Sequence, residues 1–286
     1  MFVIGTALTF EDVYLTYEKR KKIHSYSEIA TNSDVHCVND LTIVIPAYNE
    51  EDRIVPTLTD ILGNISGIKE IIVVCDGKDN TPDVARSFGS KVRVLEFSCK
   101  LGRGGAILEG FKAANSGTIC FVDADNSVPW YEIVRLSQMV NKSNPVVVGS
   151  RWTAGSKVVK KESTPKIIAG RGWHYLVMFL TGIHTKDVQC GLKFFEGEFL
   201  KELIPTIKTT NRMFDVSILY NSKIKGKEIH EVGIEWSHNE NTRMPYIHVI
   251  PVMFLYLLGL KFAHSHMAKY FGPFLNILNS KFNEIH

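Results

Sequence analysis

The chain repeats one pattern along its first 150 residues: a short apolar run, rich in β-branched residues, is followed by a segment with a helical pattern. Such runs are typical of strands that are buried on both faces of a sheet. Strands that alternate with helices predict an α/β sandwich with a mainly parallel central sheet. The predicted strands are LTIVIP (41–46), EIIVVC (70–75), KVRVLEF (91–97), TICFVD (118–123) and PVVVGS (145–150).

Polar and glycine-rich residues follow four of these predicted strands. The ligands of open parallel sheets bind beyond the carboxyl ends of the strands. We therefore expect four loops to meet at one edge of the sheet and to form a binding site there. The loops contain Tyr48-Asn49-Glu50, Asp76-Gly77, residues 100–105 and residues 123–127.

Two aspartates, Asp123 and Asp125, lie two positions apart where the fourth predicted strand ends. In an extended strand end, side chains at this spacing point the same way. Two carboxylates so close repel each other unless water or a cation lies between them. Mg²⁺ binds one or two carboxylates together with substrate phosphates. The pair therefore predicts a metal site for a nucleoside diphosphate, and a solvated loop is the alternative.

The glycines of KLGRGGAILEGF (100–111) precede a predicted helix. Small residues there allow backbone N–H groups and Arg103 to approach a diphosphate. The segment is not a dinucleotide-binding fingerprint, because Ile107 stands where the third glycine is required. A helix start that is kept small for packing is the alternative.

Charge is distributed unevenly along the chain. Residues 1–150 carry a net charge of −4, whereas residues 151–286 carry +7. A basic second half predicts an anionic partner, either a phosphate or a membrane surface, and a solvated basic face is the alternative. The five cysteines form no CxxC pair, so they indicate neither a zinc site nor a disulfide framework.

Two apolar segments lie in this basic half: GWHYLVMFLTGI (172–183) and YIHVIPVMFLYLLGLKFA (246–263). Pro251, His248 and Lys261 interrupt or bracket the second one, which is therefore a poor membrane span. We expect both segments to form helices in a membrane interface. The alternatives are a helix packed on the sheet for the first segment and a buried core helix for the second.

Seven motifs in succession carry a family resemblance: IPAYNEE (45–51), VVCDGKDNT (73–81), GRGGAILEGFKAA (102–114), VDADNS (122–127), VGSRW (148–152), DVQCGLKFF (187–195) and FDVSILY (214–220). Together they resemble the inverting GT-A-type (family 2) glycosyltransferases that make dolichyl- and polyprenyl-phosphate sugars. With EVGIEW (231–236), they are most similar to the dolichyl-phosphate β-glucosyltransferase branch. The resemblance implies a Rossmann-like GT-A catalytic domain over 41–240, an N-terminal lead-in over 1–40, and membrane-associated C-terminal helices over 241–286.

The resemblance also implies roles for individual residues. Asp125, Asp187 and Arg151 are the expected catalytic residues, and Asp125 is the more direct metal ligand, with Asp123 and Ser127 completing the metal site. The expected donor-binding residues are Pro46, Tyr48, Glu50, Asp76, Arg103, Asp123 and Gln189, and the expected acceptor-phosphate residues are Arg151, Lys166 and Arg171. Two positions depart from the family pattern: Cys75 replaces an aspartate, and Lys166 replaces an arginine that would bind phosphate with two hydrogen bonds.

The implied reaction is an inverting transfer of a sugar from a UDP-glucose-like or GDP-mannose-like donor to dolichyl or polyprenyl phosphate. It would depend on Mg²⁺ or Mn²⁺ and make a lipid-phosphate-linked sugar for glycosylation, at the cytoplasmic face of a membrane. No nucleic-acid partner is expected. A phosphate acceptor with a second pKa of about 6 is already dianionic near neutral pH and needs no strong base.

Two other functions remain open at this stage. A transferase with a hydroxyl acceptor, acting on a polysaccharide or glycolipid, would need a carboxylate base, for which Asp187 is the candidate. The other is a non-catalytic protein that binds a nucleotide-sugar.

Overall fold

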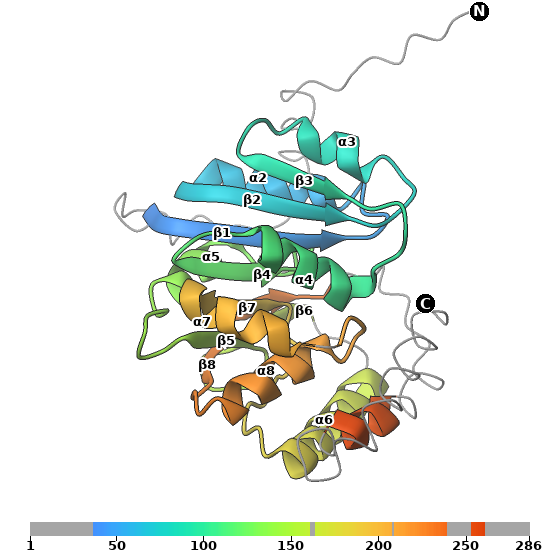
Figure 1. The fold of residues 1–286 in the computed structure, drawn as a ribbon, viewed down its shortest axis with the longest axis vertical. Coiled ribbons are helices and arrows are strands. Elements are labelled where there is room, and N and C mark those ends of the chain that lie inside the picture. Colours follow the sequence, from blue (N-terminus) through green and yellow to red (C-terminus); the bar gives the residue numbers. More distant parts are fainter. Residues whose placement is uncertain (1–36, 161–163, 208, 239–252, 261–286) are drawn as a thin grey trace, which may run out of the picture.

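The computed structural model describes residues 37–160, 164–207, 209–238 and 253–260 (Figure 1). Within them, a seven-stranded sheet has the order β3-β2-β1-β4-β7-β5-β8, and a second sheet pairs β6 with β9. The strands are β1 (Cys37–Ala47), β2 (Ser66–Cys75), β3 (Val92–Glu96), β4 (Thr118–Val122), β5 (Val146–Ser150), β6 (Lys157–Lys160), β7 (Leu192–Glu196), β8 (His230–Gly233) and β9 (Glu235–Ser237).

The large sheet is mainly parallel, as predicted. Strand β1 lies parallel to β2 and β4, β2 to β3, and β5 to β8. All five predicted strands are confirmed. The exception to the parallel order is β7, which the sequence did not predict and which lies antiparallel between β4 and β5.

Helices cover both faces of this sheet (Figure 1). Successive strand residues point to opposite faces, so Val44 packs with Phe111 of α4 while Ile43 and Ile45 pack with Leu58 of α2. Helices α4, α7 and α8 contribute to the first core cluster, and α2, α3 and α5 to the second. The helices are α2 (Ile54–Asn64), α3 (Thr81–Arg86), α4 (Gly102–Ala113), α5 (Trp130–Ser137), α6 (Thr164–Thr181), α7 (Gly197–Leu203), the 3₁₀ turn η1 (Ile204–Thr206) and α8 (Phe214–Ile224).

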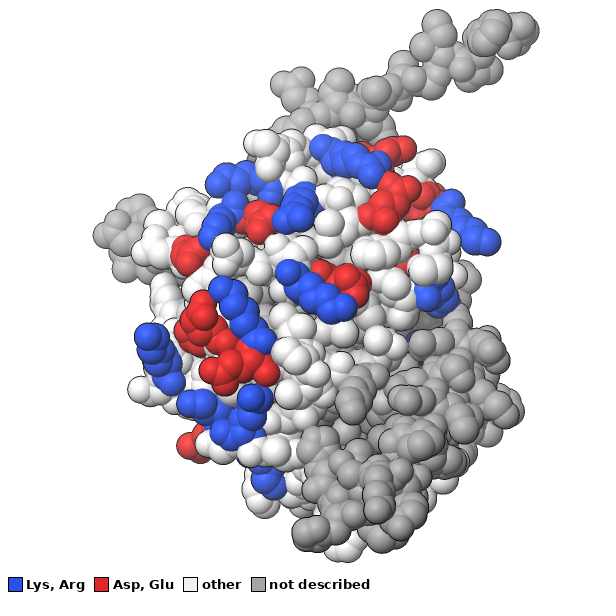
Figure 2. Space-filling view, in the orientation of Figure 1, with Lys and Arg blue, Asp and Glu red and all other residues white. Residues whose placement is uncertain are grey.

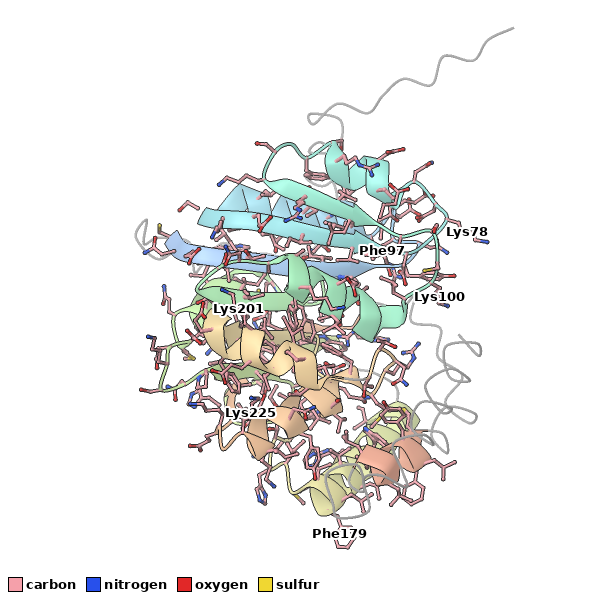
Figure 3. All side chains as sticks on the ribbon, in the orientation of Figure 1. Lys78, Phe97, Lys100, Phe179, Lys201 and Lys225 are labelled. Atoms are coloured by element: carbon pink, nitrogen blue, oxygen red, sulfur yellow. The ribbon has the colours of Figure 1, made fainter. Side chains whose placement is uncertain are left out.

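The first apolar segment forms most of α6, which lies at one end of the molecule beside helical residues 253–260 (Figure 1). One face of α6 buries Trp173 and Val177 in the first core cluster, as the packing alternative predicts. The other face exposes Tyr175 and Phe179, which are 57% and 80% accessible. Figure 3 shows Phe179 pointing away from the body of the protein.

The second apolar segment is described only over residues 253–260. Here Met253, Tyr256, Leu257 and Leu260 are buried in the core cluster that α6 joins, while Phe254 and Leu255 are exposed. This part of the segment is therefore a core helix with one apolar edge in solvent. Among the described residues, no helix combines the length and the apolarity that crossing a membrane requires.

The predicted outer segments lie largely outside the described residues. Strand β1 begins at Cys37, within the predicted lead-in 1–40, and residues 253–260 are the described part of the predicted segment 241–286. The domain boundaries therefore stay predictions. Figure 2 shows basic and acidic side chains intermingled on one face. Ion pairs among the described residues include Lys201–Glu198 and Lys112–Glu109.

Candidate active site

The carboxyl ends of β1, β2 and β4 surround a cavity of about 1120 Å³. The predicted loops therefore converge as expected from a parallel sheet. The cavity wall includes seven predicted site residues, namely Pro46, Tyr48, Glu50, Asp76, Arg103, Asp123 and Asp125. It also includes Lys78, Lys100 and Arg212, which the sequence analysis did not single out. Figure 3 shows Lys78 and Lys100 at the same end of the sheet.

Arg103, in the first turn of α4, binds two aspartates. Its Nε and Nη2 atoms lie 3.0 and 2.8 Å from Asp123 Oδ1, and its Nη1 atom lies 2.5 Å from Asp215 Oδ2. Burial lowers the pKa of Arg103, but the two carboxylates outweigh burial and raise it, so the guanidinium stays charged. The sequence had marked Arg103 and Asp123, but not the bridge to Asp215.

Lys193, in β7, is the fully buried end of this arrangement. Its side chain is 0% exposed, and its Nζ atom donates to Asp215 Oδ1 and to the Cys190 carbonyl, both at 2.6 Å. Burial raises the pKa of Asp215, but Arg103 and Lys193 together lower it below its ordinary value. We call Lys193, Asp215, Arg103 and Asp123 the Arg103 cluster. Lys193 was missed, although a lysine inside the apolar run GLKFF needs a buried partner.

Asp125 and Glu50 add further negative charge at the cavity. The Ser127 N–H donates to Asp125 Oδ1 at 3.1 Å, and Asn126 between them has a positive φ of 52°, a conformation that asparagine tolerates. Burial raises the pKa of Glu50 to about 7; Arg53 opposes this shift, and Asp125 and Asp123 add to it. Burial also raises the pKa of Asp123, which Arg103 opposes and Asp125 reinforces.

These carboxylates fit a divalent cation that shares its coordination with a phosphate. Asp123 and Asp125 line one cavity, and each raises the pKa of Glu50, so negative charge accumulates there. Mg²⁺ is held in this way by one or two carboxylates plus substrate phosphates. The described part of the chain contains no group of three or more His, Cys, Asp or Glu side chains placed to hold an ion. Ser127 is buried beside Asp125, and its role as a ligand stays a prediction.

Asp76 lies on the cavity wall and binds the start of α4. Its Oδ2 atom accepts the N–H groups of Leu101 at 2.8 Å and Gly102 at 3.0 Å. The N–H of Gly105 donates to the Thr210 carbonyl at 2.7 Å. These N–H groups are therefore bound within the protein, and the predicted approach to a diphosphate is wrong for them.

The packing alternative explains another glycine of this segment. A Cβ at Gly104 would lie 2.6 Å from the Asn211 carbonyl oxygen. Cys75, the departure from the family pattern, faces the second core cluster, and burial raises the pKa of its thiol to about 12.

The turn over residues 187–191 reaches Asp123 from the other side. A Cβ built on Gly191 would lie 2.0 Å from Asp123 Oδ2, so only glycine allows this close approach. Gln189 lies in the same turn and is half-buried. Its predicted contact with the donor stays a prediction.

Arg151 and Asp187 form a second arginine–carboxylate pair, at the carboxyl end of β5. The Arg151 backbone N–H and Nε donate to Asp187 Oδ2 at 2.9 and 2.7 Å, and Nη2 donates to Oδ1 at 2.9 Å. Both oxygens of Asp187 are therefore engaged by Arg151. The Arg151 guanidinium lies 5.0 Å from the ring centroid of Trp236 and 5.9 Å from that of Trp152.

Arg171 joins this group from α6, with its guanidinium 5.0 Å from the Trp152 ring centroid. We call Arg151, Asp187, Arg171, Trp152 and Trp236 the Arg151 cluster. The structure thus brings together two of the three predicted acceptor-phosphate residues. The third, Lys166, lies in α6, and its side chain is outside the described part of the chain.

Comparison with known proteins shows the family to which the chain belongs. The sequence model described as glycosyl transferase family 2 matches residues 42–204. The chain belongs to this family. The resemblance found in its motifs is confirmed, and the protein is a glycosyltransferase.

Three relatives of this glycosyltransferase are named dolichyl-phosphate beta-glucosyltransferase. The protein from Dictyostelium discoideum is 27% identical over 87% of this chain and 84% of its own length. The protein from Saccharomyces cerevisiae is 30% identical over 78% and 75%, and the one from Homo sapiens is 29% identical over 71% and 69%.

Solved structures confirm the predicted fold class. Glucosyl-3-phosphoglycerate synthase from Mycobacterium tuberculosis, in complex with UDP, has a TM-score of 0.59 at 16% identity, over 92% of this chain and 86% of that one. The same enzyme in complex with Mn²⁺, UDP and glucosyl-3-phosphoglycerate has a TM-score of 0.58 at 14% identity, over 92% and 86%.

Proposed function

We propose that this glycosyltransferase moves glucose, with inversion, from a UDP-sugar to a dolichyl or polyprenyl phosphate. The observation that carries the proposal is the Arg151–Asp187 pair, in which both carboxylate oxygens accept hydrogen bonds from Arg151. Asp187 is therefore committed to holding Arg151 in place, which suits an anionic acceptor better than an acceptor that needs Asp187 as its base. The names of the relatives agree with this acceptor and with glucose.

The donor is assigned to the cavity at the end of β1, β2 and β4. Its basic residues include Lys78, Lys100 and Arg212, which suit a diphosphate, and Tyr48 stacks under Lys100 with the ammonium 4.3 Å from its ring centroid. The structural neighbour was solved with UDP and with UDP-glucose and Mn²⁺. These observations favour UDP-glucose over GDP-mannose as the donor.

A divalent cation belongs to this proposal. When bound, Mg²⁺ or Mn²⁺ would balance the charge that develops on the departing nucleoside diphosphate. Asp125 would be its main protein ligand, with Asp123 and Ser127 beside it. Arg103, held against Asp123, would bind the same diphosphate and add to the stabilisation of its charge.

The acceptor phosphate would lie at the Arg151 cluster. Arg151, Arg171 and Lys166 would bind it, and Arg151, held in a fixed orientation by Asp187, would fix its angle of approach. A phosphate monoester with a second pKa of about 6 attacks without a base. Attack from the face opposite the diphosphate inverts the anomeric centre, so an α-linked donor gives a β-linked lipid phosphate.

A membrane surface is the proposed place of action, at its cytoplasmic face, because a polyprenyl chain stays in the bilayer. Tyr175, Phe179, Phe254 and Leu255 expose apolar area on α6 and on residues 253–260, which lie side by side in Figure 1. Such side chains insert at the boundary between headgroups and acyl chains. Residues 41–240 would then form the catalytic domain, and 241–286 would add membrane contact.

The test is an assay with purified protein, Mn²⁺, a short polyprenyl phosphate and a panel of UDP- and GDP-sugars, read by mass spectrometry. We expect a lipid-phosphate-linked hexose from UDP-glucose that disappears with EDTA. Donor hydrolysis without lipid product would support a hydroxyl acceptor instead. Neither product nor hydrolysis from folded protein would support a nucleotide-sugar-binding protein.

A further inference from the structure

Lys193 has no solvent contact and is linked through Asp215 to Arg103 on the wall of the proposed donor site. Burying a charge is costly unless it is paired and hydrogen-bonded, and Lys193 is paired with Asp215 and bound to the Cys190 carbonyl. Replacing a buried ion pair by apolar residues of similar volume is often neutral or stabilising. Stability alone is therefore a weak reason for this lysine, whereas its hydrogen bonds affect the geometry of the residues around it.

Charges alternate along the Arg103 cluster. Lys193 of β7 binds Asp215 of α8, which binds Arg103 of α4, which binds Asp123 beyond β4. The ammonium of Lys193 and the guanidinium of Arg103 lie 5.2 and 5.3 Å from the ring centroid of Phe121. Four elements that are distant in sequence thus meet in one chain of charge-assisted hydrogen bonds, which are the stronger kind.

Each link removes a rotational freedom from the next. Lys193 holds Asp215 Oδ1, so Asp215 presents only Oδ2 to Arg103. Arg103 Nη1 is thereby fixed, and the Nε–Nη2 edge is turned toward Asp123 Oδ1.

Lys193 also reaches Asp123 by a second route. Its bond to the Cys190 carbonyl fixes the turn whose Gly191 packs against Asp123 Oδ2. The ammonium of Lys193 is therefore linked to Asp123 Oδ1 through Asp215 and Arg103, and it also holds the turn that lies beside Asp123 Oδ2.

We propose that Lys193 and Asp215 are positioning residues that set the orientation of Arg103 and Asp123 at the donor site. The catalytic consequence rests on the proposed function, whereas the orientation itself does not. A displacement of about 1 Å in a catalytic group can cost about a hundredfold in rate. The two residues therefore act on turnover without touching the substrate.

The test variant is the double substitution Lys193→Met and Asp215→Leu, which removes one buried charge of each sign. We expect its Tm to stay close to that of the wild type, because the Arg103–Asp123 pair remains neutral. With UDP-glucose, Mn²⁺ and polyprenyl phosphate, we expect kcat to fall roughly ten- to a hundredfold, while KM for UDP-glucose changes less than about threefold. If Lys193 and Asp215 had only a structural role, kcat would stay at the wild-type value in a folded double variant.

A second readout needs neither substrate nor metal. In protein labelled with ¹⁵N-arginine, the Arg103 Nε–H resonance is assigned by its loss in Arg103→Lys. We expect this resonance to move or broaden in the double variant, because Nη1 loses its acceptor. If the double variant does not fold, Lys193→Gln takes its place with the same two readouts. Asp215 then loses the ammonium that holds Oδ1, so Arg103 is less firmly held and both changes are expected in the same direction.

Leu200→Ala is the matched control. Leu200 is 0% exposed in α7, which follows the end of β7 that pairs with Thr118, away from the cavity. It should lower Tm without changing kcat or the Arg103 resonance. Wild-type kcat with an unshifted resonance in the Lys193 variants would overturn the proposal. A wild-type protein without turnover would refute the proposed function, and the resonance would still decide whether Lys193 orients Arg103.

Discussion

The Arg103 cluster and the Arg151 cluster use the same pair of chemical groups in opposite ways. Arg103 is shared between Asp123 and Asp215, and the buried Lys193 is the second partner of Asp215. Further carboxylates, Asp125 and Glu50, line the same cavity. Arg151 is held by Asp187 through both carboxylate oxygens, and a second arginine, Arg171, lies against the same tryptophan, Trp152. The first region therefore gathers several carboxylates around one shared arginine, and the second gathers two arginines around one tryptophan.

The difference between the two clusters indicates which ligand each one suits. Excess carboxylates beside a cavity suit a cation, which in turn suits a diphosphate. A guanidinium held in a fixed orientation, with another nearby, suits a phosphate, because arginine stays charged and its N–H donors bind phosphate oxygens. The two regions are thus complementary to the donor complex and to the acceptor, and substitutions in each should have separable effects.

Asp125→Asn should have the largest effect. It removes one negative charge from the cation site, so both sugar transfer and metal-supported donor hydrolysis should fall roughly a hundred- to a thousandfold. Initial rates of UDP release, with and without lipid phosphate, measure both reactions. Asp83→Asn, on exposed α3, is the control and should change neither. Transfer that stays close to the wild-type rate would remove the basis for a cation site here.

Glu50→Gln tests the excess charge through stability. Because burial raises the pKa of Glu50 from 4.5 to about 7, the folded protein retains a proton that the unfolded chain releases. The stability linked to this group is present below pH 4.5 and is lost as the pH rises through 7. Relative to wild type, the Gln variant should therefore gain stability on the order of 3 kcal/mol between pH 4.5 and pH 8.

Urea unfolding in EDTA at the two pH values measures this difference. Glu198→Gln, at a site that is 76% exposed, is the matched control and should show no such gain. A gain that is the same at both pH values would contradict the raised pKa.

Arg151→Ala should separate the two regions. Loss of the guanidinium should lower transfer to polyprenyl phosphate by about a hundredfold, because the acceptor is no longer oriented. Donor hydrolysis should stay at the wild-type rate, since the Arg103 cluster is intact. Arg151→Lys keeps the charge but loses the fork and should cost about tenfold. An equal loss of hydrolysis and transfer would show that Arg151 does not act on the acceptor alone.

Asp187→Asn should have the smallest effect. An amide oxygen still accepts a hydrogen bond from Arg151, but one oxygen holds the guanidinium less firmly than two. Transfer should therefore fall by only about tenfold. The pH–rate profile should keep its shape. A general base would instead cost about a hundred- to ten-thousandfold and remove the corresponding limb of the profile. That outcome would support a transferase that uses a hydroxyl acceptor and Asp187 as its base.

Much of the fold was predictable because local pattern and tertiary role agree. The five strands are recognisable as β-branched runs, although β3 is an edge strand with only Val92 buried, and residues that follow β1 to β4 line the cavity. The position of β7 was not predictable in the same way. Its antiparallel place between β4 and β5 depends on long-range pairing, for which the run LKFFE carries no local signal.

The site shows the same division. Asp123 and Asp125 were found because their spacing is itself the signal. Lys193 was missed, although it is a charge among apolar residues as Asp215 is, and only the fold shows that the two meet. The glycines at 102–105 led to a wrong prediction for the backbone N–H groups. A helix start with small residues is compatible with close packing and with phosphate binding, and the sequence does not distinguish the two. The structure shows the N–H groups of Gly102 and Gly105 bound to Asp76 and Thr210.

The most direct test of the account is the linkage of the product formed from UDP-[¹³C]glucose and a short polyprenyl phosphate. The account predicts glucose joined to the lipid phosphate as a β-linked phosphodiester, which ¹³C and ³¹P couplings identify. This result follows from a single in-line attack by a phosphate held at Arg151. An α-linked product, or glucose on a hydroxyl group, would contradict it.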